Sequence, residues 1–351
     1  MQTSAIIYGA NGYTGRLIAA EAVRQGLQPI LAGRNREQVE AVATELNAPC
    51  RVFALDDVAA VARQLEGAPA VLNCAGPFSA TAAPMMEACL QAKAHYLDIT
   101  GEIDVIEAAA ALDAPAREAG VSILPAVGFD VVPSDCLAAL LAAKLPSATQ
   151  LLLAFTATGG PSPGTAKTVL ETLPSGGRAR IDGEIRRVPA AWKTRQIPFR
   201  GGQQLAETIP WGDIASAWHS TGIANIETYM AASPAMIRQQ RWLRRIAPLL
   251  RFRLVKKLIR AYIERSISGP SESQRKRGGA SFWGQVSDDQ GRIVEATLEA
   301  PEGYTLTTAT AVACLQRAIA GETRPGFATP SQAFGKDFIL GFPGVDLRWE
   351  R

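Results

Sequence analysis

Three glycines near the N-terminus, Gly9, Gly12 and Gly15, are the residues whose type and spacing point most directly to chemistry. They follow the apolar run 5–8 and precede a helix-forming stretch at 16–25. Glycine permits a tight strand-to-helix turn and lets a phosphate approach the backbone, where a helix N-terminus offers N–H groups. This pattern predicts a dinucleotide-binding turn. The residues expected at its pyrophosphate are Gly9, Asn11, Gly12, Tyr13, Thr14 and Gly15.

A cation follows the second apolar run, 29–32, which leads into Gly33-Arg34-Asn35. At this point a unit that binds NAD usually carries Asp or Glu, which holds the ribose 2′-hydroxyl. An Arg suits a 2′-phosphate instead, because the guanidinium pairs with the phosphate charge. The sequence therefore predicts NADP(H) as the cofactor, with Gly33, Arg34 and Asn35 around the 2′-phosphate.

A run of small residues ends the fourth apolar segment, in Asn73-Cys74-Ala75-Gly76-Pro77-Phe78. Ala75 and Gly76 would let the backbone approach the nicotinamide ribose, and Phe78 would offer an apolar wall. We therefore expect Ala75, Gly76, Pro77 and Phe78 to contact the cofactor. The alternative is an ordinary turn at the end of a strand.

Acidic residues follow the next two apolar segments. Asp98 and Glu102 could orient a ribose or a substrate, or supply a proton, or simply cap a helix. Asp130, in Gly128-Phe129-Asp130, has no comparable structural role and is placed where a group would meet the nicotinamide and the substrate. We predict Asp98 and Asp130 as the catalytic residues, for substrate orientation or protonation.

These residues depend on a framework of alternating short apolar runs and helical stretches. Strands are expected at 5–8, 29–32, 51–55, 70–74, 95–99 and 121–125, and helices at 16–25, 57–66, 80–92 and 103–119. Such alternation requires right-handed crossovers and produces a Rossmann-type, doubly wound parallel sheet with helices on both faces. Its ligands sit beyond the carboxyl ends of the strands, so the loops above should line one crevice.

The pattern changes after a predicted helix at 134–144. Strands are expected at 150–158, 185–188, 204–209, 227–231, 281–287 and 293–299, followed by a helix at 305–320. These segments predict a second α+β domain with a mainly antiparallel sheet. We predict that residues 1–133 with 303–335 form the nucleotide-binding domain and that residues 134–302 form the other.

Composition narrows the class of protein. The 351 residues suit two domains, and 47% hydrophobic with 20% charged residues is typical of a globular protein. The five cysteines are scattered without a C-x-x-C pair, and there are two histidines, which disfavours disulfides and a metal site. The first strand leaves no room for a signal peptide, and no long stretch lacks both charges and prolines. We expect a cytoplasmic protein without a bound metal.

Four ordered motifs together resemble one family, the saccharopine dehydrogenase-like oxidoreductases. They are Tyr8-Gly9-Ala10-Asn11-Gly12-Tyr13-Thr14-Gly15, Asn73-Cys74-Ala75-Gly76-Pro77-Phe78, Tyr96-Leu97-Asp98-Ile99-Thr100-Gly101-Glu102 and Gly128-Phe129-Asp130-Val131-Val132-Pro133-Ser134-Asp135. They look most like the branch that includes the trans-acting enoyl reductases of bacterial polyketide-lipid synthesis. Further similar stretches include Gly303-Tyr304-Thr305-Leu306-Thr307 and Pro325-Gly326-Phe327.

The resemblance implies an NADP-binding domain, a second domain for substrate and dimerisation, and a C-terminal helix that rejoins the first. It also implies that Asp130 lies beside the substrate. Here Val131-Val132-Pro133 replaces the family's Pro-Gly, and Ile99 replaces a small polar residue, so saccharopine itself is not the expected ligand. The expected reaction is hydride transfer to an activated C=C or C=N bond of a small hydrophobic, acyl-type substrate, free or bound to a carrier or coenzyme.

A basic segment, 238–277, offers a separate clue. It holds thirteen Lys or Arg against two Glu, although the net charge of the whole chain is only +3. Its apolar residues recur at helical spacing, so 238–265 could contact a membrane from the inner face, bind an acidic carrier, or simply pack as a helix with a charged outer face. Its cations are not interleaved with a base-stacking platform or a recognised reading module, so nucleic acid is not expected. The protein is expected to form a homodimer. The rival hypothesis for its function is a non-catalytic NADP-binding protein that docks on a membrane or a partner through 238–277.

Overall fold

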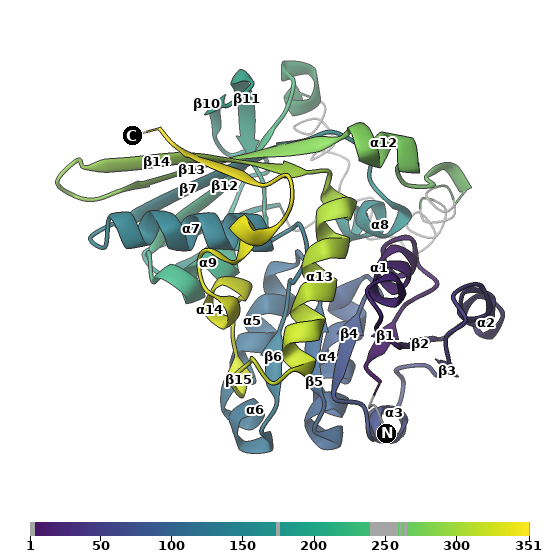
Figure 1. Cartoon of the computed structure of the whole chain (residues 1–351). Coiled ribbons are helices and arrows are strands. Elements are labelled where there is room, and N and C mark those ends of the chain that lie inside the picture. The colour runs from purple at the N-terminus through teal and green to yellow at the C-terminus, as the bar shows by residue number, and fades with distance from the viewer. Residues whose placement is uncertain (1–3, 173–175, 239–258, 260–261, 263–264, 351) are drawn as a thin grey trace. The chain divides into compact units, whose positions relative to one another are not determined.

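The structure is a computed structural model that describes all residues except 1–3, 173–175, 239–258, 260–261, 263–264 and 351 (Figure 1). The chain divides into two compact units. The first comprises Met1–Val132 with Tyr304–Gly335, and the second comprises Pro133–Gly303 with Lys336–Arg351. The sequence division had left the last of these segments unassigned, and it enters the second unit through a C-terminal strand.

The described part of the first unit is built on one sheet of seven parallel strands, in the order β15-β6-β5-β4-β1-β2-β3. The strands are β1 (Ile6–Tyr8), β2 (Ile30–Gly33), β3 (Cys50–Val52), β4 (Ala70–Asn73), β5 (His95–Asp98), β6 (Ser122–Leu124) and β15 (Gly326–Phe327). The order reverses between β1 and β4, so the carboxyl ends of these two strands flank the crevice where such a sheet binds ligands. The predicted doubly wound parallel sheet is confirmed.

Helices cover both faces of this sheet because every parallel connection must cross over it (Figure 1). They are α1 (Tyr13–Arg24), α2 (Arg36–Glu45), α3 (Val58–Leu65), α4 (Phe78–Ala92), α5 (Ile103–Ala111), α6 (Asp113–Ala119), α13 (Gly303–Ile319) and α14 (Pro330–Phe334). Between α3 to α6 and the sheet lies a continuous core that includes Met85, Met86 and Tyr96. This buried layer fixes the positions of the strand ends.

Two local predictions in this unit were wrong. The single helix expected at 103–119 is two helices, α5 and α6, which meet at Leu112. Pro115 explains the break, because proline lacks an N–H and its ring clashes with the carbonyl four residues earlier. The sequence reading also missed α2, which begins directly after Asn35.

The second unit contains, in its described residues, a sheet of nine strands with the main order β10-β11-β12-β7-β13-β14-β16. The strands are β7 (Gln150–Ala157), β8 (Gly177–Ile181), β9 (Glu184–Val188), β10 (Thr194–Phe199), β11 (Gly202–Thr208), β12 (Asn225–Ala231), β13 (Gly279–Ser287), β14 (Ile293–Pro301) and β16 (Asp346–Trp349). Only β7 and β12 pair in parallel among these described strands. The prediction of a mainly antiparallel second sheet is therefore confirmed.

One face of this sheet is covered by helices. The described helices of the unit are α7 (Val132–Lys144), α8 (Pro163–Thr172), α9 (Asp213–Thr221), α12 (Glu272–Arg277) and the 3-10 turn η3 (Phe338–Gly341). Helix α7 lies so close to β13 that a Cβ at Gly284 would fall 2.5 Å from Leu141 Cδ1. The sequence reading missed α8 and α9. No helix in the described part of the chain has both the length and the apolar character needed to cross a membrane.

Candidate functional site

The predicted phosphate turn connects β1 to α1, and its geometry requires glycine. Gly9 has a φ of 80°, and a Cβ there would lie 2.8 Å from the backbone nitrogen of Ala75. A Cβ at Gly15 would lie 2.2 Å from the Gly9 carbonyl oxygen. Contacts this short are excluded for any side chain, so the turn folds this tightly only with hydrogen at both positions. The backbone is therefore left open to a ligand.

Helix α1 begins at the edge of this turn without a competing anion. Its N-cap residue is Gly12, which is exposed, and no side chain caps the helix. The first turn of the helix also contains no acidic residue. The N–H groups of a first helical turn have no acceptor within the helix, and the helix dipole places partial positive charge there. The turn therefore fits a pyrophosphate group.

The end of β2 supplies the predicted cation. Arg34 is exposed, and none of the carboxylates that the structure describes forms an ion pair with it. Asn35 caps α2, since its Oδ1 accepts from the Gln38 N–H at 3.1 Å. Asn11 Nδ2 donates to Gln38 Oε1 at 2.8 Å, and a Cβ at Gly33 would fall 2.8 Å from Asn11 Oδ1. Asn11, Gly33 and Asn35 thus shape the loop in which Arg34 can meet a phosphate.

The loop after β4 lies directly beside the phosphate turn. The Cys74 N–H donates to the Tyr8 carbonyl at 2.8 Å, which joins the ends of β4 and β1. Asn73 is fully buried and accepts the Ala75 N–H at 3.1 Å, so it bends the chain after the strand. Gly76 and Pro77 follow, joined by a cis peptide bond. The ring of Phe78 is 8% exposed and belongs to the core, and its expected role as a wall of the nicotinamide site stays a prediction.

Glu102 caps a helix, although not the one that follows it. Its two carboxylate oxygens accept the Phe78 and Ser79 N–H groups, each at 2.9 Å, at the N-terminus of α4. This arrangement places a negative charge at the positive end of the α4 dipole and holds the 75–78 loop against the end of β5. Spacing along the chain gives no signal for this contact, because Glu102 and Phe78 are far apart in sequence.

Asp98 is fully buried at the end of β5. It accepts the Tyr96 hydroxyl at 2.7 Å, the Thr100 N–H at 3.0 Å and the Ala126 N–H at 2.7 Å. Burial raises its pKa to about 6 in spite of these three donors, and the charge of Glu102 adds to the shift. The contacts tie the ends of β5 and β6 together. The catalytic role expected for Asp98 stays a prediction.

Asp130 lies on the loop after β6 and is partly exposed. Its carboxyl group fits against Gly101, where a Cβ would lie 2.6 Å from Oδ2. Burial raises the pKa of Asp130 to about 7, with a further contribution from the charge of Glu102. A carboxyl group with this pKa is about half protonated at neutral pH, and its protonated form can donate a proton. Of the two predicted catalytic residues, Asp130 is partly exposed to solvent and Asp98 is not.

The structure adds a contact that sequence reasoning missed. Tyr304, in the first turn of α13, packs edge-on against Tyr13, with 4.9 Å between ring centroids and an interplanar angle of 82°. Tyr13 is the first residue of α1, so the C-terminal helix of this unit reaches the phosphate turn. The Gly303-Tyr304-Thr305 motif was the only sequence signal available, and it carried no information about its neighbour in space.

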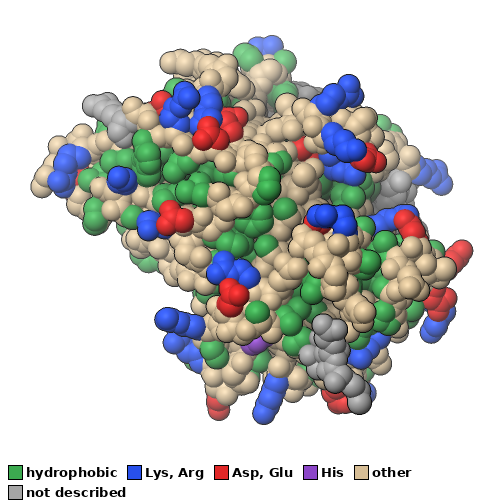
Figure 2. Space-filling view, in the orientation of Figure 1, with side chains coloured by type: hydrophobic (Ala, Val, Ile, Leu, Met, Phe, Trp, Pro, Cys, Tyr) green, Lys and Arg blue, Asp and Glu red, His purple; other side chains and the backbone are tan. Residues whose placement is uncertain are grey.

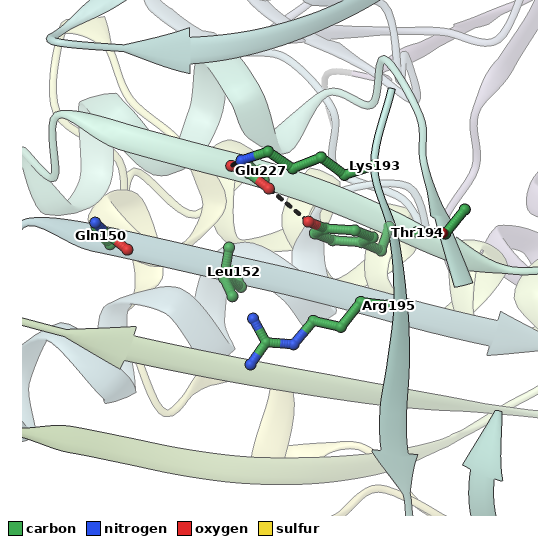
Figure 3. A pocket seen from close by; sticks show the side chains of 7 residues that line it. Gln150, Leu152, Lys193, Thr194, Arg195 and Glu227 are labelled. Atoms are coloured by element: carbon green, nitrogen blue, oxygen red, sulfur yellow. Dashed lines mark hydrogen bonds and ion pairs between the residues drawn. The ribbon is translucent and has the colours of Figure 1, made fainter. Parts of the chain in front are cut away.

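A hollow of about 490 Å³ lies elsewhere, on the sheet of the second unit (Figure 3). Lys193 reaches over β12 to pair with Glu227, while Arg195 extends along the sheet near Leu152. None of the predicted site residues lines this hollow. Within the described residues, no group of three or more His, Cys, Asp or Glu is arranged to hold a metal ion.

A family model described as the saccharopine dehydrogenase NADP-binding domain matches residues 5–124. That segment contains β1 to β6, the glycine turn and Arg34. This segment of the chain is similar to the NADP-binding domain of saccharopine dehydrogenases. The predicted family resemblance and the predicted cofactor, NADP(H), are both confirmed. Two features of this segment fit NADP(H). The uncapped start of α1 fits the pyrophosphate of the cofactor, and the exposed Arg34 fits its 2′-phosphate.

Curated relatives match part of the chain. A human saccharopine dehydrogenase-like oxidoreductase is 29% identical over 150 residues, which cover 37% of this chain and 35% of the human protein. The chain thus spans 35% of the length of that relative. A putative trans-acting enoyl reductase of Mycobacterium tuberculosis is 28% identical over 249 residues, or 61% of this chain and 56% of that protein.

The fold of the whole chain also has a solved counterpart. Apo saccharopine dehydrogenase (L-Glu forming) from Saccharomyces cerevisiae matches with a TM-score of 0.66, covering 99% of this chain and 100% of that structure. Only 10% of the sequence is identical. This likeness therefore concerns the fold alone, namely a unit with a parallel sheet and a second unit with a mixed sheet.

Proposed function

We propose that this protein is an NADPH-dependent reductase that delivers a hydride to an activated C=C or C=N bond of a hydrophobic, acyl-type substrate. The observation that carries the proposal is the position of Asp130 in the NADP-binding unit. It is a partly exposed carboxyl group with a pKa of about 7, and it follows a strand whose carboxyl end belongs to the cofactor-binding edge.

The cofactor, when bound, supplies the hydride. The residues of the chain bind the cofactor, orient the substrate and protonate it. The glycine turn and the start of α1 hold the pyrophosphate, and Arg34 holds the 2′-phosphate. Ala75 and Gly76 leave room beside the phosphate turn, and Glu102 holds their loop in place through the backbone of α4. Positioning and electrostatics are what a protein contributes to hydride transfer by a cofactor.

Asp130 would complete the reduction. When a hydride adds to one end of a C=C or C=N bond, the other end gains an electron pair and must receive a proton. The protonated carboxyl of Asp130 can supply it and take a proton back from water before the next turnover. Gly101 is essential to this placement because any side chain there would occupy the position of Asp130 Oδ2.

The substrate class rests on two observations. Val131-Val132-Pro133 follows Asp130 where the family resemblance implies Pro-Gly in the lysine-pathway enzymes, which disfavours an amino-acid substrate. The relative from Mycobacterium tuberculosis carries the name of a putative trans-acting enoyl reductase. Both favour an acyl chain over an amino acid. A carrier or a coenzyme would then bear the acyl group as a thioester.

The partners and the location form part of the same proposal. We place the protein in the cytoplasm as a homodimer, with 238–265 able to contact an inner membrane face. Most of this basic segment lies outside the described residues. On the visible face of the molecule, basic side chains are interspersed with acidic ones (Figure 2). The rival, a non-catalytic NADP-binding protein that docks through 238–277, depends on that segment alone.

The test is a direct assay of the full chain. NADPH oxidation is followed with 2-enoyl thioesters and with cyclic imines, while NADPH binding is measured separately by fluorescence. We expect binding together with turnover of a 2-enoyl thioester, and loss of turnover but not of binding in Asp130→Asn. Binding without turnover of any of these substrates, accompanied by pelleting with anionic liposomes that requires 238–277, would favour the rival.

A further inference from the structure

We propose that Thr307 of α13 is a positioning residue that holds the Asp130 loop in the geometry needed for proton donation. This inference rests on the proposed function, since it concerns the residue to which that function assigns the proton. The argument begins with the contacts of α13, a helix that is separated from the Asp130 loop by more than 170 positions of sequence.

Two threonines of α13 hold the loop on both sides of Gly128. The Phe129 N–H donates to Thr307 Oγ1 at 3.0 Å, and Thr310 Oγ1 donates to the Val127 carbonyl at 2.9 Å. Both threonines are buried, so these bonds do not compete with water. They lie one helical turn apart and therefore face the same way from α13.

The Thr307 side chain also packs closely against Gly128. A Cβ at Gly128 would lie 3.0 Å from Thr307 Cγ2 and 3.3 Å from Thr307 Oγ1. Glycine at this position thus lets the helix approach the loop backbone. The same threonine side chain provides both the acceptor for Phe129 and the surface that meets Gly128.

Asp130 directly follows the residue that Thr307 binds. The loop then closes on itself, because the Val131 and Val132 N–H groups both donate to the Gly128 carbonyl, at 3.3 and 3.0 Å. On the other side the Asp130 carboxyl meets the backbone of Gly101. A shift of Phe129 would therefore move the Asp130 carboxyl away from Gly101 and toward water.

The charge of Glu102 reaches Asp130 from the side of Gly101. Glu102, next to Gly101, is a charge that acts on the Asp130 carboxyl, and Asp98 holds the start of the same loop through Ala126. Helix α13 contributes neutral hydroxyls to the loop. Thr307 therefore acts through position and not through charge.

The variant that tests this is Thr307→Val, which keeps the shape of the side chain and removes the acceptor. Thr307→Ser restores the acceptor. Thr308→Val is the matched control, because Thr308 Oγ1 donates to the Tyr304 carbonyl within α13 and does not reach the Asp130 loop. The first readout needs no cofactor: the titration of the Asp130 carboxyl by ¹³C NMR, assigned by its absence in Asp130→Asn.

We expect Thr307→Val to lower the pKa of Asp130 by about one unit, because the carboxyl becomes more hydrated. With an enoyl thioester, kcat should fall about tenfold and the alkaline limb of the pH profile should move to lower pH. The affinity for NADPH should stay within about twofold, since the loop carries no phosphate contact. Thr307→Ser and Thr308→Val should titrate as the wild type does.

A Thr307→Val protein with the titration and pH profile of the wild type would overturn the inference. If that variant does not fold, Thr310→Val is measured instead, and an unchanged titration there has the same meaning. The two proposals fail separately. If the wild type oxidises no NADPH with any substrate while Thr307→Val still shifts the titration, the proposed function fails and the positioning role of Thr307 stands.

Discussion

Two polar regions of this chain differ in what satisfies their polar groups: the cofactor-binding edge of the first sheet and the hollow on the second sheet. In the hollow, side chains satisfy one another. Lys193 pairs with Glu227, Tyr229 donates to Glu227, and Arg195 donates to Gln285 at 3.3 Å. At the cofactor-binding edge, the side chains of Asn73, Asp98 and Glu102 instead accept hydrogen bonds from backbone N–H groups.

The difference shows how each region would treat a ligand. In the hollow, an incoming anion would have to displace Glu227 from Lys193, and the pair would lose its own attraction. At the phosphate turn, glycines and an uncapped helix leave backbone donors and an exposed Arg34 for the ligand. Binding capacity here comes from the arrangement of the backbone. A large hollow is therefore a poorer guide to the site than an uncapped helix N-terminus.

The largest effect is expected at Gly15. The substitution Gly15→Ala places a Cβ 2.2 Å from the Gly9 carbonyl oxygen, so the turn must open and lose its hold on the pyrophosphate. We expect affinity for NADPH to fall by more than about a hundredfold, or about 3 kcal/mol. Fluorescence titration measures this. Gly160→Ala, where no atom lies within 4 Å of the new Cβ, should bind as the wild type does.

The next effect concerns Asp130. Asp130→Asn should lower kcat about a hundredfold while NADPH binding is kept, because an amide does not donate a proton to carbon. Stopped-flow oxidation of NADPH with an enoyl thioester would measure it. A variant with wild-type kcat would remove Asp130 from the mechanism.

Asp130 also gives a pH dependence of known sign. Its pKa is raised in the folded state to about 7, so folding favours the protonated form. The resulting stabilisation is full below the pKa of the unfolded chain and is lost as pH rises through about 7. Asp130→Asn should therefore gain thermal stability relative to the wild type between pH 5 and 8. A melting-temperature difference that does not change with pH would contradict the raised pKa.

An intermediate effect is expected at Arg34. Arg34→Asp should weaken NADPH binding by about tenfold to a hundredfold and leave NADH binding unchanged or improved, because one charge-assisted bond to the 2′-phosphate is lost. Arg36→Asp is the control, since Arg36 already pairs with Glu40 at 2.9 Å. Equal NADPH affinity in Arg34→Asp and the wild type would refute the role of Arg34.

The smallest effect is expected in the hollow on the second sheet. Glu227→Gln in the hollow should cost about 1 kcal/mol of folding stability or less, since its partner Lys193 is largely exposed. Affinity for NADPH should not change. Urea unfolding and fluorescence titration measure the two. A loss of NADPH affinity in this variant would mean that the hollow takes part in cofactor binding.

The features that could be predicted from the sequence are those that depend on local residues. The glycine turn, Arg34 and the alternation of strands and helices each depend on neighbours within one short segment. The same is true of the helix at 305–320, which the structure places at Gly303–Ile319. The wrong and missed helices also have local causes. Pro115 breaks the helix expected at 103–119, and the polar stretch after Asn35 concealed α2.

The sequence by itself determined the doubly wound sheet, the dinucleotide turn and the preference for NADP(H), because backbone freedom, periodicity and one cation act over short distances. Only the tertiary structure decided which acidic residue is exposed to solvent and which is buried. Glu102 meets Phe78 across 24 positions, Asp98 meets Ala126 across 28, and Thr307 meets Phe129 across 178. Such contacts form only when the sheet brings its strand ends together, so burial and pKa at Asp98 and Asp130 follow from the fold.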